Sequence, residues 1–267
     1  MVTIHCFFSG GRDSALACYI AHRVARVRGW EFRLIHINTT IYLKETHDYV
    51  YEYARWLGVD LIELKPNVTY EDLAVKYGYP SLFKNRWCYH QLKRTPTLNY
   101  LRQNYKPGDL MVLGVRGSES LFRLLRYDKV FTNRCFGKSF CVNAWYPILH
   151  LTDVEVNQLI RKFNIPVNPV WVKVGISGEC LCLAGTTEQT LIKLFRNYPD
   201  VAKWFVDLDK RIQANRRKKE PSYPLALYRK KITLSEWYER LLRQSQIDDF
   251  ITNYQSCPFS CMVNDLA

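Results

Sequence analysis

The clearest signal of fold lies at the start of the chain, in Val2-Thr3-Ile4-His5-Cys6-Phe7-Phe8-Ser9-Gly10-Gly11-Arg12-Asp13-Ser14. The apolar and β-prone residues at positions 2–8 predict a buried strand, and the small and apolar residues from Ser14 to Arg28 predict a helix. Between them, glycines let the backbone approach a ligand closely, and the new helix offers unpaired N–H groups at its positive dipole end. The stretch therefore predicts an α/β protein with a phosphate-binding loop.

The same alternation of strand and helix continues outward from this loop. Further strands are expected at residues 32–38, 61–64, 110–114 and 140–144, with helices at residues 47–57, 92–104 and 152–163. After prolines at 166 and 169, the pattern is helical over residues 191–197, 201–215 and 234–243. We expect a Rossmann-like parallel sheet with helices on both faces in residues 1–175. A smaller helical, cysteine-bearing extension is expected in residues 176–267.

Composition narrows the class of protein. Hydrophobic residues make up 48% and aromatic residues 14% of the 267 positions, as is typical of a folded protein. The sequence has no long apolar run, and its start lacks a basic leader and a cleavage site, so we expect a soluble cytoplasmic protein with no membrane association. The formal charge of +13 suits a nucleic acid and equally a multiply charged nucleotide. The sequence leaves the oligomeric state open.

The loop supplies the first set of candidate binding residues, which are Ser9, Gly10, Gly11, Arg12, Asp13 and Ser14. The hydroxyls of Ser9 and Ser14 add donors to the backbone N–H groups. Asp13 is unexpected beside phosphates unless it caps the turn or helps to hold Mg²⁺, which would neutralise departing pyrophosphate. The loop lacks both the Gly-Lys-Ser/Thr ending of the Walker motif and the Gly-x-Gly-x-x-Gly dinucleotide fingerprint. Those two nucleotide-binding classes are excluded.

Two motifs in the right order resemble one family. The strand, the Ser-Gly-Gly-Arg-Asp-Ser loop and the helix resemble the PP-loop of the adenine-nucleotide alpha-hydrolase superfamily. The segment Leu113-Gly114-Val115-Arg116-Gly117-Ser118-Glu119-Ser120 resembles the GxRxxES segment of the phosphoadenosine phosphosulfate (PAPS) reductase family. Weaker matches, such as Trp87-Cys88 and Asn168-Pro169, extend the likeness over residues 2–185. The resemblance implies an enzyme that binds ATP or an adenylyl sulfate for sulfur transfer or reduction.

The resemblance also implies roles for single residues. The loop residues would hold phosphate or sulfate oxygens, and Arg116 would reach the same anion from the opposite side. Chemistry agrees, because a guanidinium at the carboxyl end of a strand grips an oxyanion with two parallel hydrogen bonds. Glu119 would orient Arg116, carry part of a metal site, or form a simple surface ion pair. The catalytic candidates are Asp13, Lys93, Arg116 and Glu119.

Two departures from the family pattern affect the expected chemistry. Asn38-Thr39-Thr40 stands where many members have Asp-Thr-Gly, so Asn38 and Thr39 are the candidate nucleotide contacts there. The C-terminal Glu-Cys-Gly-Leu-His segment, with the nucleophilic cysteine of the reductases, is absent. The intact loop suits cleavage of ATP between its α and β phosphates, with adenylation of an acceptor that is then thiolated. Reduction of an adenylyl sulfate would need another thiolate, such as Cys257 or Cys261.

The nine cysteines divide into two groups. Their odd number and a reducing compartment make them poor disulfide candidates. We expect Cys6, Cys18, Cys135 and Cys141 to be small buried hydrophobes. The candidate metal ligands are Cys88, Cys180, Cys182, Cys257 and Cys261. Four of these would hold a four-iron four-sulfur cluster, with zinc as the alternative, in surroundings made positive by Arg86, Lys93 and Arg116.

A second class of function is nucleic-acid binding, either by a module that retains the fold or by an enzyme that thiolates tRNA or DNA. Residues 200–245 hold twelve Lys or Arg against six Asp or Glu, with a peak at Arg216-Arg217-Lys218-Lys219. Phosphate contacts from these residues would combine with stacking on nearby aromatic residues, namely Trp204, Tyr223, Tyr228 and Trp237. A solvated helix end and loop is the alternative interpretation. A sulfur acceptor or a reductant protein is also expected as a partner.

Overall fold

The computed structural model describes residues 1–81, 86–119, 123, 127, 129–137, 140–216 and 220–255, with side chains up to residue 244. Six strands form one sheet in the order β3-β2-β1-β4-β6-β5, and every pairing is parallel except that of β5 with β6. The strands are β1 Thr3–Phe7, β2 Glu31–Ile37, β3 Leu61–Leu64, β4 Leu110–Leu113, β5 Phe131–Cys135 and β6 Cys141–Trp145. The predicted α/β fold class is confirmed.

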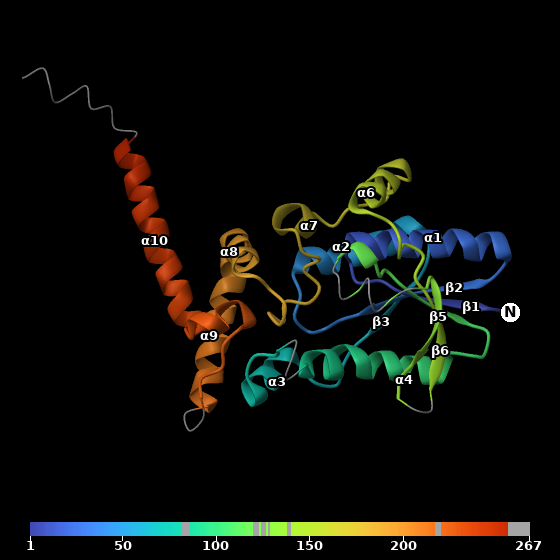
Figure 1. Cartoon of the computed structure of the whole chain (residues 1–267), viewed down its shortest axis with the longest axis horizontal. Coiled ribbons are helices and arrows are strands. Elements are labelled where there is room, and N and C mark those ends of the chain that lie inside the picture. Colours follow the sequence, from blue (N-terminus) through green and yellow to red (C-terminus); the bar gives the residue numbers. More distant parts are fainter. Residues whose placement is uncertain are drawn as a thin grey trace, which may run out of the picture.

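Helices cover both faces of the sheet (Figure 1). The helices of the sheet-bearing part are α1 Arg12–Arg28, α2 Lys44–Leu57, α3 Tyr70–Tyr77, the π-helical η1 Cys88–Arg94, α4 Thr95–Asn104, the 3₁₀ turn η2 Gly117–Glu119, α6 Asp153–Lys162 and α7 Pro169–Val174. Alternate residues of β1 point to opposite faces, as the pleat requires. Ile4 and Cys6 pack in the cluster with α1 and α2, whereas Phe7 packs toward α4.

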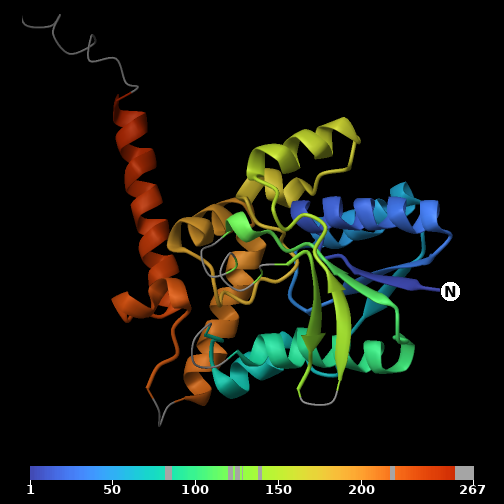
Figure 2. The ribbon, with the colours of Figure 1, turned by 45° about the vertical axis from the view of Figure 1, so that its right-hand side comes forward.

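The C-terminal helices gather beyond one end of the sheet (Figure 2). They are α8 Glu188–Asn197, α9 Pro199–Asn215, the 3₁₀-helical η3 Leu225–Lys230 and α10 Leu234–Gln255. Their apolar cluster, which includes Phe205 and Leu234, also contains Tyr70 and Trp87 from the first half of the chain. The two halves thus share a core across residue 175, and the division of the chain there remains a prediction. Within the described residues, no helix is long and apolar enough to cross a bilayer.

The prediction missed two features of the fold. Strand β5 was not expected, because its residues alternate between exposed and half-buried positions and carry little apolar signal. The predicted helix at 92–104 is two elements, since η1 ends at Arg94 and Pro96 stands in the first turn of α4, where proline is favoured. The capped start predicted at Thr152 is confirmed, because Thr152 and Glu155 form a capping box at the start of α6.

Candidate functional site

The phosphate loop joins β1 to α1 at the carboxyl edge of the sheet. Gly10 has a φ of +70°, which favours glycine, and a Cβ there would lie only 3.0 Å from Thr46 Cγ2. Ser14 Oγ donates to the Gly11 carbonyl at 2.9 Å and lies 3.0 Å from Ser9 Oγ. Helix α1 begins after Gly11 with no side-chain cap among the described residues. The N–H groups of its first turn are therefore available to an anion.

Arg116 joins the loop from the next strand along the sheet. Its Nε donates to Asp13 Oδ2 at 3.0 Å, and its second guanidinium nitrogen lies 3.0 Å from Asp153 Oδ1. The side chain is only 4% exposed, whereas that of Asp153 is 64% exposed. Arg12 Nε donates to Asp13 Oδ1 at 3.1 Å, so Asp13 is held between two guanidinium groups. This alternation of charge fixes Arg116 beside the loop.

Gly114 allows the two motifs to approach each other. It follows β4, and a Cβ at this position would lie 2.6 Å from Cα and 2.7 Å from N of Ser14. No side chain fits in that space. Next to this contact lies a hollow of about 320 Å³, lined by the loop, Arg116, Glu119 and residues 175–177. The sequence-predicted anion contacts Ser9, Gly11, Asp13, Ser14 and Arg116 therefore converge on one hollow.

A larger cavity of about 870 Å³ adjoins this hollow and shares Ser9, Ser14 and Gly114 with it. The sheet contributes apolar side chains to it, namely Phe7, Ile35, Ile37, Met111 and Leu113. Helices η1 and α4 contribute Lys93, Arg94 and Thr97. An apolar floor with a few polar groups, in a cavity of this size, is what a nucleoside-sized ligand requires.

Three of the predicted metal-binding cysteines lie together. The Cys182 thiol is near enough to those of Cys88 and Cys180 to shift their titration. Its interaction with Cys88 lowers the pKa of the Cys88 thiol, whereas its interaction with Cys180, together with burial, raises the pKa of the Cys180 thiol. Cys257 and Cys261 lie outside the described residues. In the part of the chain that is described, no three His, Cys, Asp or Glu side chains are arranged to hold one metal ion.

Glu179 and Lys93 lie between the thiols and the large cavity, which both of them line. Lys93 Nζ is 4.0 Å from Glu179 Oε2. Burial raises the pKa of Glu179 to about 8, and the nearby Cys180 and Glu179 raise the pKa of Lys93. Lys93 therefore keeps a positive charge next to the thiol of Cys180.

Asn38 and Thr39 are engaged in bonds that brace the end of β2. Asn38 Nδ2 donates to Glu63 Oε1 at 2.9 Å, and Thr39 Oγ1 donates to the Glu179 carbonyl at 2.8 Å. Neither is among the described residues that line the two cavities. Their predicted contact with a nucleotide remains a prediction.

Glu119 does not bond to the Arg116 side chain in the described structure. Its carboxylate forms an ion pair with Arg123. A surface ion pair was one of the three roles expected for Glu119 from the sequence. Arg116 is oriented by Asp13 and Asp153 instead. Sequence reasoning did not identify Asp153 in this role, because as the first residue of α6 it reads simply as a favourable charge at a helix start.

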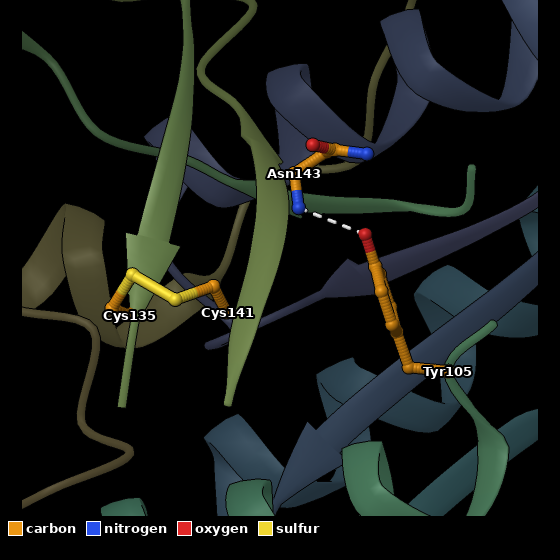
Figure 3. Close-up of a disulfide and its surroundings, with 4 residues drawn as sticks. All are labelled: Tyr105, Cys135, Cys141 and Asn143. Carbon is orange, nitrogen blue, oxygen red and sulfur yellow. Dashed lines mark hydrogen bonds between the residues drawn. A yellow bond between two sulfur atoms is a disulfide. The ribbon is translucent and has the colours of Figure 1, made fainter. Parts of the chain in front are cut away.

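The prediction that Cys135 and Cys141 are buried hydrophobes is wrong. They stand directly opposite each other on β5 and β6, both exposed, and form a disulfide with Cα atoms 4.0 Å apart (Figure 3). The reason is the unpredicted strand β5, whose pleat places both thiols on the outer face. Cys6 and Cys18 are confirmed as buried, each with no exposed surface.

Asn168 is a structural residue of the site whose role the sequence did not reveal. Its amide Nδ2 donates to the carbonyls of Gly10 and Ser177, each at 2.8 Å, and the residue is 1% exposed. It ties the phosphate loop to the segment that leads to the thiols. The signal available in the sequence was Asn168-Pro169, a typical helix start.

Only some of the aromatic residues predicted to bind a nucleic acid are exposed to solvent. Trp237 is 5% exposed, and its indole N–H donates to Glu188 at 2.9 Å. Trp204 packs edge-on against Phe205, whereas Tyr228 is exposed. Of the basic peak, residues 217–219 lie outside the described residues.

Comparison with known proteins gives a family match. A family model described as the phosphoadenosine phosphosulfate reductase domain matches residues 3–182. Two uncharacterized proteins of Methanocaldococcus jannaschii are 25% and 26% identical over 198 and 208 residues. These matches cover 74% and 78% of this chain but 39% and 48% of the relatives, so the chain spans less than half of either.

Solved structures show a weaker likeness. The phosphate complex of phosphoadenylyl-sulfate (PAPS) reductase from Candida auris is 18% identical, with a TM-score of 0.48 over 64% of this chain and 77% of that one. The NH₃-dependent NAD synthetase of Campylobacter jejuni is 16% identical, with a TM-score of 0.41 over 81% of this chain and 84% of that one. At these values the likeness carries no information on activity.

Proposed function

Since the chain belongs to the phosphoadenosine phosphosulfate reductase domain family, we propose that it binds an adenine nucleotide with its phosphate or sulfate end at the PP-loop. The observation that carries the proposal is the convergence of the uncapped first turn of α1 with the buried Arg116 on one hollow, which adjoins the 870 Å³ cavity. The adenosine would occupy the larger cavity. The anion would occupy the smaller one, between Ser14 and Arg116.

Charge in the smaller hollow is nearly balanced before a nucleotide enters. Arg12 and Arg116 are paired with Asp13 and Asp153. Arg123 also lines the hollow, but it is paired with Glu119, so the net attraction for an anion comes from the helix terminus. Asp13 would offer a carboxylate to Mg²⁺ beside the anion, which is one of the two roles that the sequence suggests for it.

We propose further that the site carries out sulfur transfer or reduction. Support comes from the three thiols that adjoin Lys93 and Glu179, both of which line the nucleotide cavity. Cys88 of η1, Cys180 and Cys182 would supply three of the four thiolates that such a cluster takes, with the fourth from Cys257 or Cys261. When bound, the cluster would supply redox-active iron and sulfide. Lys93 would stabilise the thiolate forms of the cysteines.

Two reactions are compatible with this site. In the first, an acceptor oxygen attacks the α-phosphorus of ATP, pyrophosphate leaves from the PP-loop, and a sulfur nucleophile then displaces AMP from the acceptor. In the second, a thiolate attacks the sulfur of an adenylyl sulfate, the S–O bond breaks, the adenosine phosphate leaves, and an S-sulfocysteine forms. A thiol reductant then attacks the cysteine sulfur, which releases sulfite and leaves a disulfide. The intact PP-loop favours the first, since it is built to hold a departing pyrophosphate.

One set of incubations separates these reactions. Anaerobically purified protein is mixed separately with ATP and candidate acceptors and with each of the two adenylyl sulfates and a dithiol, and pyrophosphate and sulfite are measured. Pyrophosphate in the mixture with ATP and acceptors identifies the first reaction. Sulfite in a mixture with an adenylyl sulfate identifies the second. The Arg161→Ala variant, which changes an exposed arginine of α6, is the matched control for Arg116→Ala. Folded protein that yields neither product refutes both reactions.

A nucleic acid is the second candidate, as the sulfur acceptor. The described residues that line the large cavity include five basic side chains and one acidic side chain, a positive surface that suits the phosphates of a nucleic acid as well as those of a nucleotide. The basic residues are Arg86, Lys93, Arg94, Arg123 and Arg134, and the acidic one is Glu179. Binding of RNA or DNA that weakens steeply with salt would support this acceptor, and no binding at low salt would remove it.

A further inference from the structure

The Cys135–Cys141 disulfide crosslinks the hairpin at the edge of the sheet. Phe136 N donates to the Phe140 carbonyl at 2.7 Å, so the next pair, Cys135 and Cys141, is a non-hydrogen-bonded pair. In such pairs the side chains approach most closely, which allows a disulfide across the strands. Both cysteines are exposed, so small thiol reagents and redox proteins can reach the bond.

The residues on either side of Cys135 belong to the nucleotide cavity. Arg134 and Phe136 both line it, on the opposite face of the strand from the disulfide. The Arg134 guanidinium lies 5.5 Å from the centre of the Phe136 ring. The crosslink is therefore one residue away from two side chains of the cavity wall.

Strand β5 is held from one side. In the described sheet it pairs with β6 and is the last strand in the order. Its outward face is polar or exposed, since Phe131, Asn133 and Cys135 are all exposed. A short edge strand with one neighbour opens more easily than a central strand. A covalent bond near its end limits how far β5 can separate from β6.

We infer that Cys135 and Cys141 form a reversible oxidation site whose disulfide holds Arg134 and Phe136 in the wall of the nucleotide cavity. A dithiol reductant breaks the S–S bond, delivers two electrons and two protons that leave both residues as thiols, and itself becomes a disulfide. Reduction lets the end of the hairpin open, so the cavity wall is complete for only part of the time. The effect on the ligand rests on the proposed nucleotide site, whereas the redox chemistry does not.

Two measurements on the full chain test this inference. Protein purified without reductant is alkylated with iodoacetamide before and after dithiothreitol, and the fragment with residues 135–141 is analysed by mass spectrometry. Amide hydrogen exchange of β5 and β6 and ATP affinity by calorimetry are then measured in both redox states. The variants are the double variant Cys135→Ser/Cys141→Ser and, as matched control, Asn133→Ser. Asn133 is exposed on the same face and faces Asn143 across the strands.

We expect alkylation of both cysteines only after reduction, together with faster exchange in the hairpin. ATP affinity should fall about threefold to tenfold on reduction, in proportion to the fraction of time the wall is complete. The double variant should show the weaker affinity with or without dithiothreitol, which separates this effect from any effect on Cys88, Cys180 or Cys182. Asn133→Ser should behave like the parent.

Two results overturn the redox part of the inference. One is full alkylation before reduction, and the other is hairpin exchange that is identical in the two redox states. If ATP binds neither state, the proposed nucleotide site is refuted. Hairpin exchange and alkylation then still decide whether the disulfide is a reversible oxidation site that restrains β5. Equal ATP affinity in both states, with faster exchange on reduction, refutes the coupling to the cavity.

Discussion

Replacing Arg116 with alanine should weaken nucleotide binding without unfolding the protein. Arg116 Nε lies 3.0 Å from Asp13, and a second guanidinium nitrogen lies 3.0 Å from the exposed Asp153. Arg12 remains as a partner for both carboxylates in the variant, so no buried charge is left alone. The fold should therefore persist, because Asp13 keeps Arg12 as a partner and Asp153 is 64% exposed.

The effect on binding should be larger than the effect on stability. A hydrogen bond to a charged group contributes about 1.5 to 3 kcal/mol, which corresponds to roughly a tenfold to 150-fold rise in Kd. Loss of the Arg116 charge also leaves the Asp13 carboxylate less neutralised, so that it repels the bound anion. Kd for ATP is measured by calorimetry and Tm by circular dichroism, with Arg161→Ala as the control. Equal Kd values for Arg116→Ala and Arg161→Ala would refute this account of the hollow.

Further expectations concern the spacing of the two motifs, acid stability and the thiols. Gly114→Ala should prevent ATP binding, because its Cβ would lie within 2.7 Å of the Ser14 backbone; calorimetry that finds parental affinity would contradict this. Burial by itself would raise the pKa of Glu63, but hydrogen bonds from His47 and Asn38 outweigh burial and lower this pKa from 4.5 to about 2. Stability from Glu63 is therefore present above pH 4.5 and lost as pH falls toward 2, and Glu63→Gln should flatten that part of the Tm profile. Cys182→Ser should remove bound iron from anaerobically purified protein, whereas Cys18→Ser should not; iron, sulfide and zinc analysis checks both, and stoichiometric zinc without iron would instead support a zinc site.

The sheet and the phosphate loop were predictable because their signals are local. Residues 2–14 combine a strand pattern, a glycine turn and a helix start within one stretch, and each signal is confirmed in β1 and α1. The position of Arg116 followed from its place directly after a predicted strand. Parallel strands bring their carboxyl ends to one edge, so residues after β1 and β4 had to meet.

The remainder depended on contacts that the sequence does not encode locally. Strand β5 has an exposed face and a single neighbour, so its residues carry no continuous apolar run, and the disulfide that depends on it was missed. The partners of Arg116 were also missed, because Asp153 is distant in sequence and reads as an ordinary helix-start charge. The convergence of Cys88 with Cys180 and Cys182 was expected only as a meeting of segments, since no spacing rule joins residues so far apart.

Competition between ATP and inorganic pyrophosphate tests the central claim most directly. In the proposed site, the phosphate end of an adenine nucleotide lies between Ser14 and Arg116, in a hollow that pyrophosphate can also occupy without a nucleoside. Calorimetric titration should therefore show that ATP binds, that pyrophosphate competes with ATP for the site, and that adenosine binds much more weakly than ATP. Binding of ATP that is unaffected by saturating pyrophosphate, or no binding of ATP by folded protein, would contradict the claim.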